Sequence, residues 1–202
     1  MGTSWRWIGN AMLWLGSVGF LWGLFALYTE SLVPGYVEFP LGYMGSFAVD
    51  SNSRIYCGTQ FYGRVQIYDA AGRFVSSHYV EVGGGRFQLD VDDDDNLIVV
   101  GARNQVRYTY DHEMNLLSQR PDPGGRVFKE LEKRRGPRYR DRHGTSYISR
   151  DLFLLYPHIV KIDRSGESRV VVRTPLYLWP LMGPVLNWLL LGTGWWIYVS
   201  KS

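Results

Sequence analysis

The side chains of this sequence best suited to metal chemistry form an acidic run near its middle. Aspartates occupy position 90 and positions 92–95, and Asn96 follows them. Oxygen ligands of this kind suit Ca²⁺, but a helix–loop–helix calcium site also needs glycine at its sixth position and glutamate at its twelfth. Counted from Asp90, those positions hold Asp95 and Gly101. We therefore expect a solvated hairpin turn here and no metal site.

No other set of residues forms a convincing catalytic constellation. The sequence lacks the spacing motifs of serine hydrolases, zinc proteases, paired redox cysteines and phosphate-binding loops. The three glycines at 83–85 fall between two expected strands, as a linker turn would, and Asp141 with His143 falls in another expected turn. The single cysteine, Cys57, forms no internal disulfide and is expected to be buried in a strand. We expect no catalytic residue and no cofactor, and we expect the protein not to be an enzyme.

A basic stretch at 126–142, RVFKELEKRRGPRYRDR, is the most charged part of the chain. Its first half can form a helix that Gly136 and Pro137 would end. Its side chains could meet anionic lipid headgroups or an acidic partner, or could simply be solvated. Nucleic acid is not an expected partner, because the net charge is only +3 and the domain is expected outside the cytoplasm. The candidate contact residues are Arg126, Lys129, Lys133, Arg134, Arg135, Arg138 and Arg140.

The central part of the chain repeats itself. The string at 49–58 (VDSNSRIYCG) aligns with the string at 91–100 (VDDDDNLIVV), so that Asp50 lies over Asp92 and Ile55 over Leu97. A fainter third copy begins near Asp141. Each copy alternates short strands with turns held by Asp, Asn or Gly, which suit tight turns. The alternation in RVQIYD marks half-buried strands. The aligned residues lie 42 positions apart. A repeat of about 42 residues with three or four strands is the size of a β-propeller blade.

These strings resemble the NHL-type blade repeats. The residues that fit the family pattern are Val49, Asp50, Ile55, Tyr56, Arg64, Val65, Ile67, Tyr68, Asp69 and Gly72. Ser53 stands where glycine is usual, and the second copy is unusually acidic. The resemblance implies a mainly β fold of three propeller-like antiparallel blade repeats, at about 44–82, 86–120 and 138–174, with the basic insert at 121–140. It implies an architecture and no particular activity.

Three blades do not close a propeller, which usually needs four to eight. Open strand edges invite another chain. We expect either a second copy or a different subunit to cover the edges, or a small open stack of sheets that the basic insert shields.

The two ends of the chain are apolar and hold all eight tryptophans. Residues 7–28 and 176–200 contain no charged side chain, and about 20 apolar residues suffice to cross a bilayer as a helix. We therefore expect a transmembrane helix within 1–30, an extramembrane β domain at 31–175, and a second transmembrane helix within 176–202. The alternatives are a cleaved signal peptide at the first end and an interfacial or re-entrant segment at the second, which prolines interrupt. The expected membrane-interface anchors are Trp5, Trp7, Trp179, Trp195 and Trp196.

Small and polar residues within the two ends predict packing against other helices. The expected packing residues are Gly16, Gly19, Gly23, Asn10 and Asn187. Arg6 and Lys201 flank the outer ends of the two spans, and the positive-inside bias then places both termini in the cytoplasm and the β domain on the extracytoplasmic, periplasmic side. Arg173 argues in the opposite direction.

Two kinds of function fit this organisation. The first is a membrane-anchored accessory or scaffold subunit, whose helices pack on other membrane subunits while its β domain caps a partner or mediates assembly. The second is a membrane-tethered, propeller-like module that binds or senses a ligand. The expected partners are the lipid bilayer and other membrane subunits or a second copy of the chain.

Overall fold

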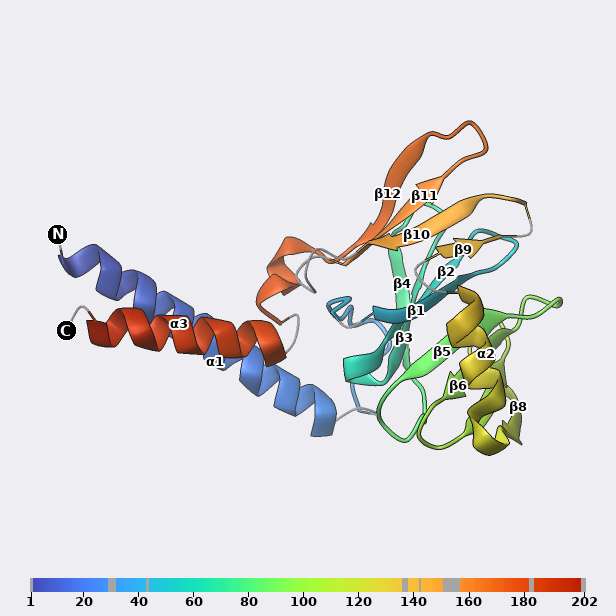
Figure 1. The fold of residues 1–202 in the computed structure, drawn as a ribbon, viewed down its shortest axis with the longest axis horizontal. Helices are drawn as coiled ribbons and strands as arrows, with labels where there is room; N and C mark the ends of the chain where they lie inside the picture. The colour runs from blue at the N-terminus through green and yellow to red at the C-terminus, as the bar shows by residue number, and fades with distance from the viewer. Residues whose placement is uncertain are drawn as a thin grey trace.

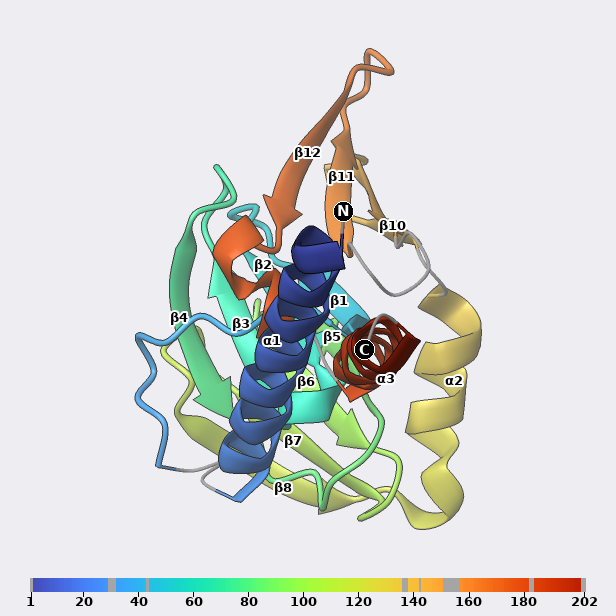
Figure 2. The same cartoon turned by 90° about the vertical axis from the view of Figure 1, so that its left-hand side faces the viewer.

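The computed structural model describes residues 2–28, 32–42, 44–135, 138–141, 143–150, 157–181 and 184–200, and for residues 2–4, 26–28, 135, 179–181 and 184–185 it describes the backbone alone. A long helix pair projects from one side of a β domain (Figure 1). The pair consists of α1 (Gly2–Tyr28) and α3 (Pro184–Ser200). Both chain ends lie at the tip of the pair farthest from the β domain (Figures 1 and 2).

The β domain contains three four-stranded antiparallel sheets, which confirms the expectation of three blade-like repeats. Blade 1 comprises β1 (Met44–Val49), β2 (Ile55–Thr59), β3 (Arg64–Tyr68) and β4 (Phe74–Tyr79). Blade 2 comprises β5 (Phe87–Val91), β6 (Leu97–Gly101), β7 (Val106–Tyr110) and β8 (Leu116–Pro121). Blade 3 comprises β9 (Arg138–Arg140), β10 (Ser146–Arg150), β11 (His158–Ile162) and β12 (Ser168–Arg173). The one-turn helices are η1 (Gln60–Tyr62), η2 (Pro123–Gly125) and η3 (Leu176–Leu181), and the basic insert forms α2 (Arg126–Arg135).

The same aspartate-led turn joins the first two and the last two strands of every blade. At Asp50, the backbone N–H donates to the Arg54 carbonyl, and the Ser53 N–H donates to the Asp50 carbonyl. The carboxylate Oδ1 of Asp50 accepts the N–H groups of Asn52 and Arg54, at 2.9 and 2.8 Å. The same backbone pair of hydrogen bonds recurs at Asp69, Asp92, Asp111, Asp141 and Asp163. The prediction that aspartates hold the turns is therefore confirmed, and the acidic run forms one of these turns.

Blade 1 lies between the other two blades, so the order in space differs from the order in the chain. One of its faces packs on blade 2, through a cluster that joins Ala48 and Tyr56 to Leu89 and Val99. Its other face packs on blade 3, where Ile55 contacts a cluster that includes Tyr147 and Ile159. The innermost strand β1 accordingly contacts both β5 and β9. The three blades form an open arc rather than a closed ring.

The two middle strands of blade 1 are buried on both faces, which corrects the prediction that RVQIYD is half-buried. Every residue of β2 and β3 is buried. One face of β3 meets blade 2 through Val65 and Ile67. On the other face Tyr68 meets blade 3, whereas Arg64 and Gln66 are covered by the segment that precedes β1. Cys57 is fully buried in this blade, as expected.

The helix α2 covers the face of blade 2 that points away from blade 1. Its side chains Phe128 and Leu131 pack on Val100, with Ile98 and Ala102 at the margin. The buried carboxylate of Asp122 accepts the backbone N–H groups of Val127 and Phe128 at 3.0 and 3.1 Å and so caps the start of the helix. The predicted helix in the basic insert is confirmed, and it shields an apolar sheet face that a fourth blade would otherwise cover.

The two apolar ends form helices of different length. The segment Trp5–Phe25 of α1 is long and apolar enough to cross a membrane. The predicted second transmembrane helix is not shown, because α3 has only 17 residues and rises about 26 Å at 1.5 Å per residue, less than the hydrocarbon thickness of about 30 Å. The structure therefore supports one apolar N-terminal helix that could serve as a signal anchor.

A pair of glycines in equivalent turns tests the packing between blades 1 and 3. Gly72 and Gly166 both have positive φ, at 81° and 83°. A Cβ at Gly72 would lie 1.6 Å from the Val171 carbonyl oxygen, whereas a Cβ at Gly166 would meet nothing within 4 Å. We expect Gly166→Ala to lower the free energy of unfolding by about 1 kcal/mol through backbone strain alone. Gly72→Ala should cost about 2–4 kcal/mol because it also separates two blades. Urea unfolding of both variants measures the difference, and equal losses would contradict this packing.

Candidate functional site

The first candidate site is the contact between α1 and α3, where glycines bring two backbones close together. A Cβ at Gly194 would lie 2.9 Å from the Gly9 carbonyl oxygen and 3.0 Å from the Leu13 nitrogen. A Cβ at Gly16 would lie 3.0 Å from the Asn187 carbonyl oxygen and 2.9 Å from Leu191. The helices are antiparallel, and only residues without a side chain permit this approach.

The packing residues expected from the sequence fall in different surroundings. Gly16 faces α3, whereas Gly23 faces the β domain, where a Cβ would lie 3.5 Å from the Phe61 ring. Gly19 is buried and Asn10 is exposed. Asn187 is 1% exposed, and among the described residues its Oδ1 has no hydrogen-bond partner. Gly9 and Gly194 were not predicted from the sequence, because the two lie far apart in the chain and neither has a small residue four positions away in its own helix.

The outward surface of the helix pair is apolar and aromatic. Trp7 and Trp14 are 72% and 73% exposed, and leucines and valines lie between the aromatic residues. Trp5 and Trp7 near the start of α1 lie at the same tip as Trp195 and Trp196 near the end of α3, because the helices are antiparallel. At this tip Arg6 stacks over the Tyr198 ring at 5.6 Å. The Trp179 side chain lies outside the described residues.

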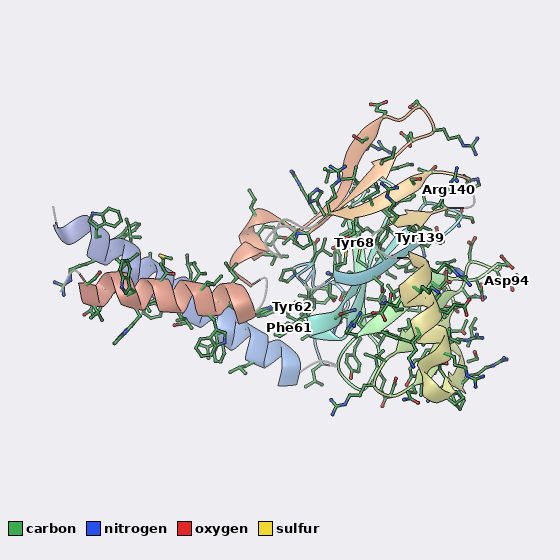
Figure 3. All side chains as sticks on the ribbon, in the orientation of Figure 1. Phe61, Tyr62, Tyr68, Asp94, Tyr139 and Arg140 are labelled. Carbon is green, nitrogen blue, oxygen red and sulfur yellow. The ribbon has the colours of Figure 1, made fainter. Side chains whose placement is uncertain are left out.

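An aromatic cluster docks the other end of α1 on the β domain. Phe61 and Tyr62 of η1 lie beside the helix pair (Figure 3). The Tyr62 ring lies 4.8 Å from the Phe39 ring, which in turn lies 5.9 Å from Trp22. Burial raises the pKa of Tyr62, so its phenol stays neutral. This cluster joins anchor and blade in one packed unit.

Two buried polar side chains of blade 1 hold the segment that leads from α1 to β1. The Gln66 amide makes two hydrogen bonds with the Phe39 backbone, at 2.7 and 2.9 Å. Arg64, only 2% exposed, donates to the Val33 carbonyl at 3.0 Å and stacks over the Phe39 ring at 5.0 Å. Burial lowers the pKa of this guanidinium. The sequence indicated Arg64 only as part of the repeat pattern, because its contacts come from outside the repeat.

The basic insert lies on the side of the β domain away from the helix pair. Figure 1 places α2 there, and Figure 3 places Arg140 there. The exposed side chains are Arg126, Lys129, Lys133, Arg134, Arg138 and Arg140. Lys129 donates to the Gly124 carbonyl at 3.2 Å, and Arg134 pairs with Glu130. The Arg135 side chain lies outside the described residues.

Two adjoining hollows open beside this insert, on blade 3. The larger has a volume of about 570 Å³ and is lined by residues that include His143, Arg164, Ser146 and Arg140. The smaller has a volume of about 440 Å³ and shares Ser146 and Arg140 with it. The neighbouring Asp141–Thr145 turn contacts blade 1, since the His143 ring donates Nε2–H to the Ser51 carbonyl at 3.1 Å. This backbone contact holds the His143 ring in place.

A third hollow, of about 580 Å³, lies between blades 1 and 3 and is lined in part by Glu38, Phe74 and Arg173. The Tyr68 hydroxyl donates to Glu38 Oε1 at 3.2 Å. Burial raises the pKa of Glu38 and outweighs the lowering effect of this hydrogen bond. Burial also raises the pKa of Tyr68 well above its usual value. Within the described residues, no cluster of three or more His, Cys, Asp or Glu side chains is arranged to hold a metal ion.

No protein-family model matches the chain, and no curated protein is similar to it. Similar solved structures include a catalytically inactive virginiamycin B lyase from Staphylococcus aureus with quinupristin, at 12% identity and TM-score 0.35, covering 63% of this chain and 40% of that one. They also include hydrazine synthase of Kuenenia stuttgartiensis, at 17% identity and TM-score 0.33, covering 63% and 37%. A third is a protein of Bacteroides fragilis described as exported, at 11% identity and TM-score 0.37, covering 71% and 42%.

The chain thus spans about two fifths of the length of these solved proteins. At such identities the likeness concerns the β-repeat architecture alone. One expectation from the sequence is corrected by it. The statement that the protein is not an enzyme was wrong, because the similar structures include virginiamycin B lyases, which are enzymes. The missing sequence motifs do not exclude catalysis, since an active site on this architecture need not use them.

The close approach of the two helices can be tested with a matched pair of glycines in α3. Gly194 touches the α1 backbone, whereas a Cβ at Gly192 would meet nothing within 4 Å. We expect Gly194→Leu to force the helices apart and to lower the stability of the helix pair by about 1–3 kcal/mol. Gly192→Leu should leave it nearly unchanged. Thermal unfolding in mild detergent, followed by circular dichroism, gives both values, and an equal effect of the two substitutions would rule out the contact.

The half-buried carboxylate of Glu38 should make the stability of the protein depend on pH. Because the pKa of Glu38 is raised above 4.5 in the folded protein, folding favours its protonated form. Protonated Glu38 contributes its full stabilisation below the pKa that it has in the unfolded chain. This stabilisation is lost as the pH rises through the higher pKa that it has in the folded protein. Glu38→Gln removes the charge and keeps an acceptor for Tyr68. We expect a gain of about 0.5 kcal/mol near neutral pH, after allowance for solvent screening, and none near pH ~4. Urea titrations at both pH values measure the free energy of unfolding of the variant and of the unchanged protein. An equal gain in stability at both pH values would show that the charge of Glu38 is not the cause.

Proposed function

We propose that this protein is a membrane-anchored accessory or scaffold subunit of a membrane protein complex. The observation that carries the proposal is the helix pair, which is closely packed on its inner side and apolar on its outer side. A soluble protein rarely leaves so many large apolar side chains in water. Lipid tails or the helices of other subunits would cover them.

In this proposal α3 accompanies α1 into the membrane. A helix shorter than the hydrocarbon thickness is accommodated by local thinning of the bilayer or by association with other helices, and α3 packs along α1. The tryptophans gathered at the tip of the pair suit a membrane–water interface. Arg6 at the same tip favours a cytoplasmic location for both termini, with the β domain on the extracytoplasmic, periplasmic side.

The edge of blade 2 offers a surface for a partner outside the membrane. The strand β8 lies at the outer edge of its sheet, with neighbours on one side only. Leu116 and Leu117, adjacent in this strand, are 52% and 56% exposed. Leu117 is the extra residue at a bulge in the β7–β8 pairing, so the two leucines form a local apolar spot at the start of this edge strand. An edge of this kind pairs readily with a strand of another chain.

The composition of the detergent-solubilised particle tests the proposed function. We expect the full-length chain to resist carbonate extraction and to co-purify with other membrane subunits in a fixed ratio. Leu117→Lys should release those subunits that bind the β domain, while Val75→Lys, an equally exposed change on the edge of blade 1, should not. A particle with the mass of one or two 23.3 kDa chains would instead favour the tethered ligand-binding or sensing module. Release by carbonate would exclude both.

A further inference from the structure

The face of blade 3 that points away from blade 1 carries a row of polar and basic residues. In β9 the Tyr139 side chain points toward blade 1, where its ring lies 6.0 Å from Phe47 and its hydroxyl donates to the Val49 carbonyl at 2.9 Å. Arg138 and Arg140 alternate with it and therefore lie on the opposite face. Ser146 of β10 is directly across from Arg140. No blade covers this face among the described residues, because blade 3 ends the arc.

Two guanidinium groups converge at one turn on this face. Arg164 Nε donates to the His143 carbonyl at 2.8 Å, and its Nη2 contacts the same oxygen. Arg140 Nε lies 3.4 Å from the Gly144 carbonyl oxygen. A Cβ at Gly144 would lie 3.7 Å from Arg164 Nε and 3.9 Å from Arg140 Nη2. The backbone of the turn thus fixes two cations around a single glycine.

The hollows around this pair are strongly basic. Their lining includes four arginines, Arg134, Arg138, Arg140 and Arg164, and one carboxylate, Asp163. Arg134 is paired with Glu130, so the other three arginines carry the positive charge of the site. Asp163 lies 3.8 Å from the Lys161 ammonium group, so its charge is already balanced. Like charges held close together repel each other. An anion placed between the two guanidinium groups would remove this repulsion.

The donor set fits phosphate better than a single carboxylate. A guanidinium carries five N–H groups, of which the backbone of the turn uses at most two here, and its fork matches two oxygens of a phosphate. The two hollows adjoin at Arg140 and Ser146, which gives room for two anionic groups in line. Volumes of about 300–1,000 Å³ are usual for small-molecule sites.

We propose that this face of blade 3 is a binding site for a soluble ligand that carries two linked phosphate groups. One phosphate occupies the space between Arg140 and Arg164, and the other reaches Arg138 in the adjoining hollow. The headgroups of the protein's own membrane are a poor source of these phosphates, because the site lies on the side of the β domain opposite the helix pair (Figure 3). The proposal does not depend on the proposed function, since it uses only the β domain.

Calorimetric titration of the full-length protein in uncharged detergent, with inorganic pyrophosphate as the probe, tests the site. We expect saturable binding that Arg164→Gln weakens about tenfold or more, through loss of a charge-assisted bidentate contact. Arg164→Lys should restore only part of the affinity. Because Arg164 also fixes a turn, Arg138→Gln provides a second variant on the exposed strand β9, and it should weaken pyrophosphate binding without changing the melting temperature.

Arg169→Gln is the matched control, since it removes the same charge from exposed β12 of the same blade, outside both hollows. Its affinity should equal that of the unchanged protein. Equal weakening by Arg169→Gln and Arg138→Gln would overturn the proposal in favour of diffuse charge attraction. Absence of saturable pyrophosphate binding would overturn it as well. Binding to vesicles rich in phosphatidylglycerol without binding to pyrophosphate would assign the arginines to a lipid surface instead.

Discussion

Burial of blade 1 on both faces is the constraint on which the rest of the β domain depends. Its alternate side chains supply the contacts for blade 2 on one side and for blade 3 on the other. The two outer blades are joined mainly through it, although the half-buried Tyr139 of blade 3 also packs against the cluster that blade 1 shares with blade 2. The anchor depends on the same blade, because Arg64, Gln66 and η1 hold the connecting segment and the end of α1.

An aspartate-led turn explains how one short pattern could specify this architecture. In five of the six turns the aspartate carboxylate accepts one or two backbone N–H groups of the turn. The fourth residue has positive φ in all six. Because these hydrogen bonds join residues that are close in the chain, the turns, the strands between them and the three repeats could be predicted from the sequence alone. The helix in the basic insert was predictable for the same reason, since Gly136 and Pro137 must end it.

The arrangement of the blades in space could not be predicted from the repeats. The alternation in RVQIYD predicted a half-buried strand, because polar residues such as Arg64 and Gln66 usually mark a solvent-facing side. Both are buried here, because they hydrogen-bond to the segment that precedes β1, which lies outside the repeat. The basic residues were also identified without their geometry. Arg164 belongs to a different hairpin from Arg140, and only the fold brings both guanidinium groups to Gly144. The helix contact depended likewise on Gly9 and Gly194, which are distant in the chain and carry no common motif.

The distribution of tryptophan has a practical consequence for spectroscopy. All eight tryptophans belong to α1, η3 or α3, and the three blades contain tyrosine and phenylalanine but no tryptophan. Emission excited at the red edge of indole absorbance therefore reports on the helical elements and, through Trp22, on their contact with the β domain, whereas the blades themselves contain no indole. A denaturation experiment that compares this emission with far-ultraviolet ellipticity would show whether the helix pair and the β domain lose their structure together or one after the other.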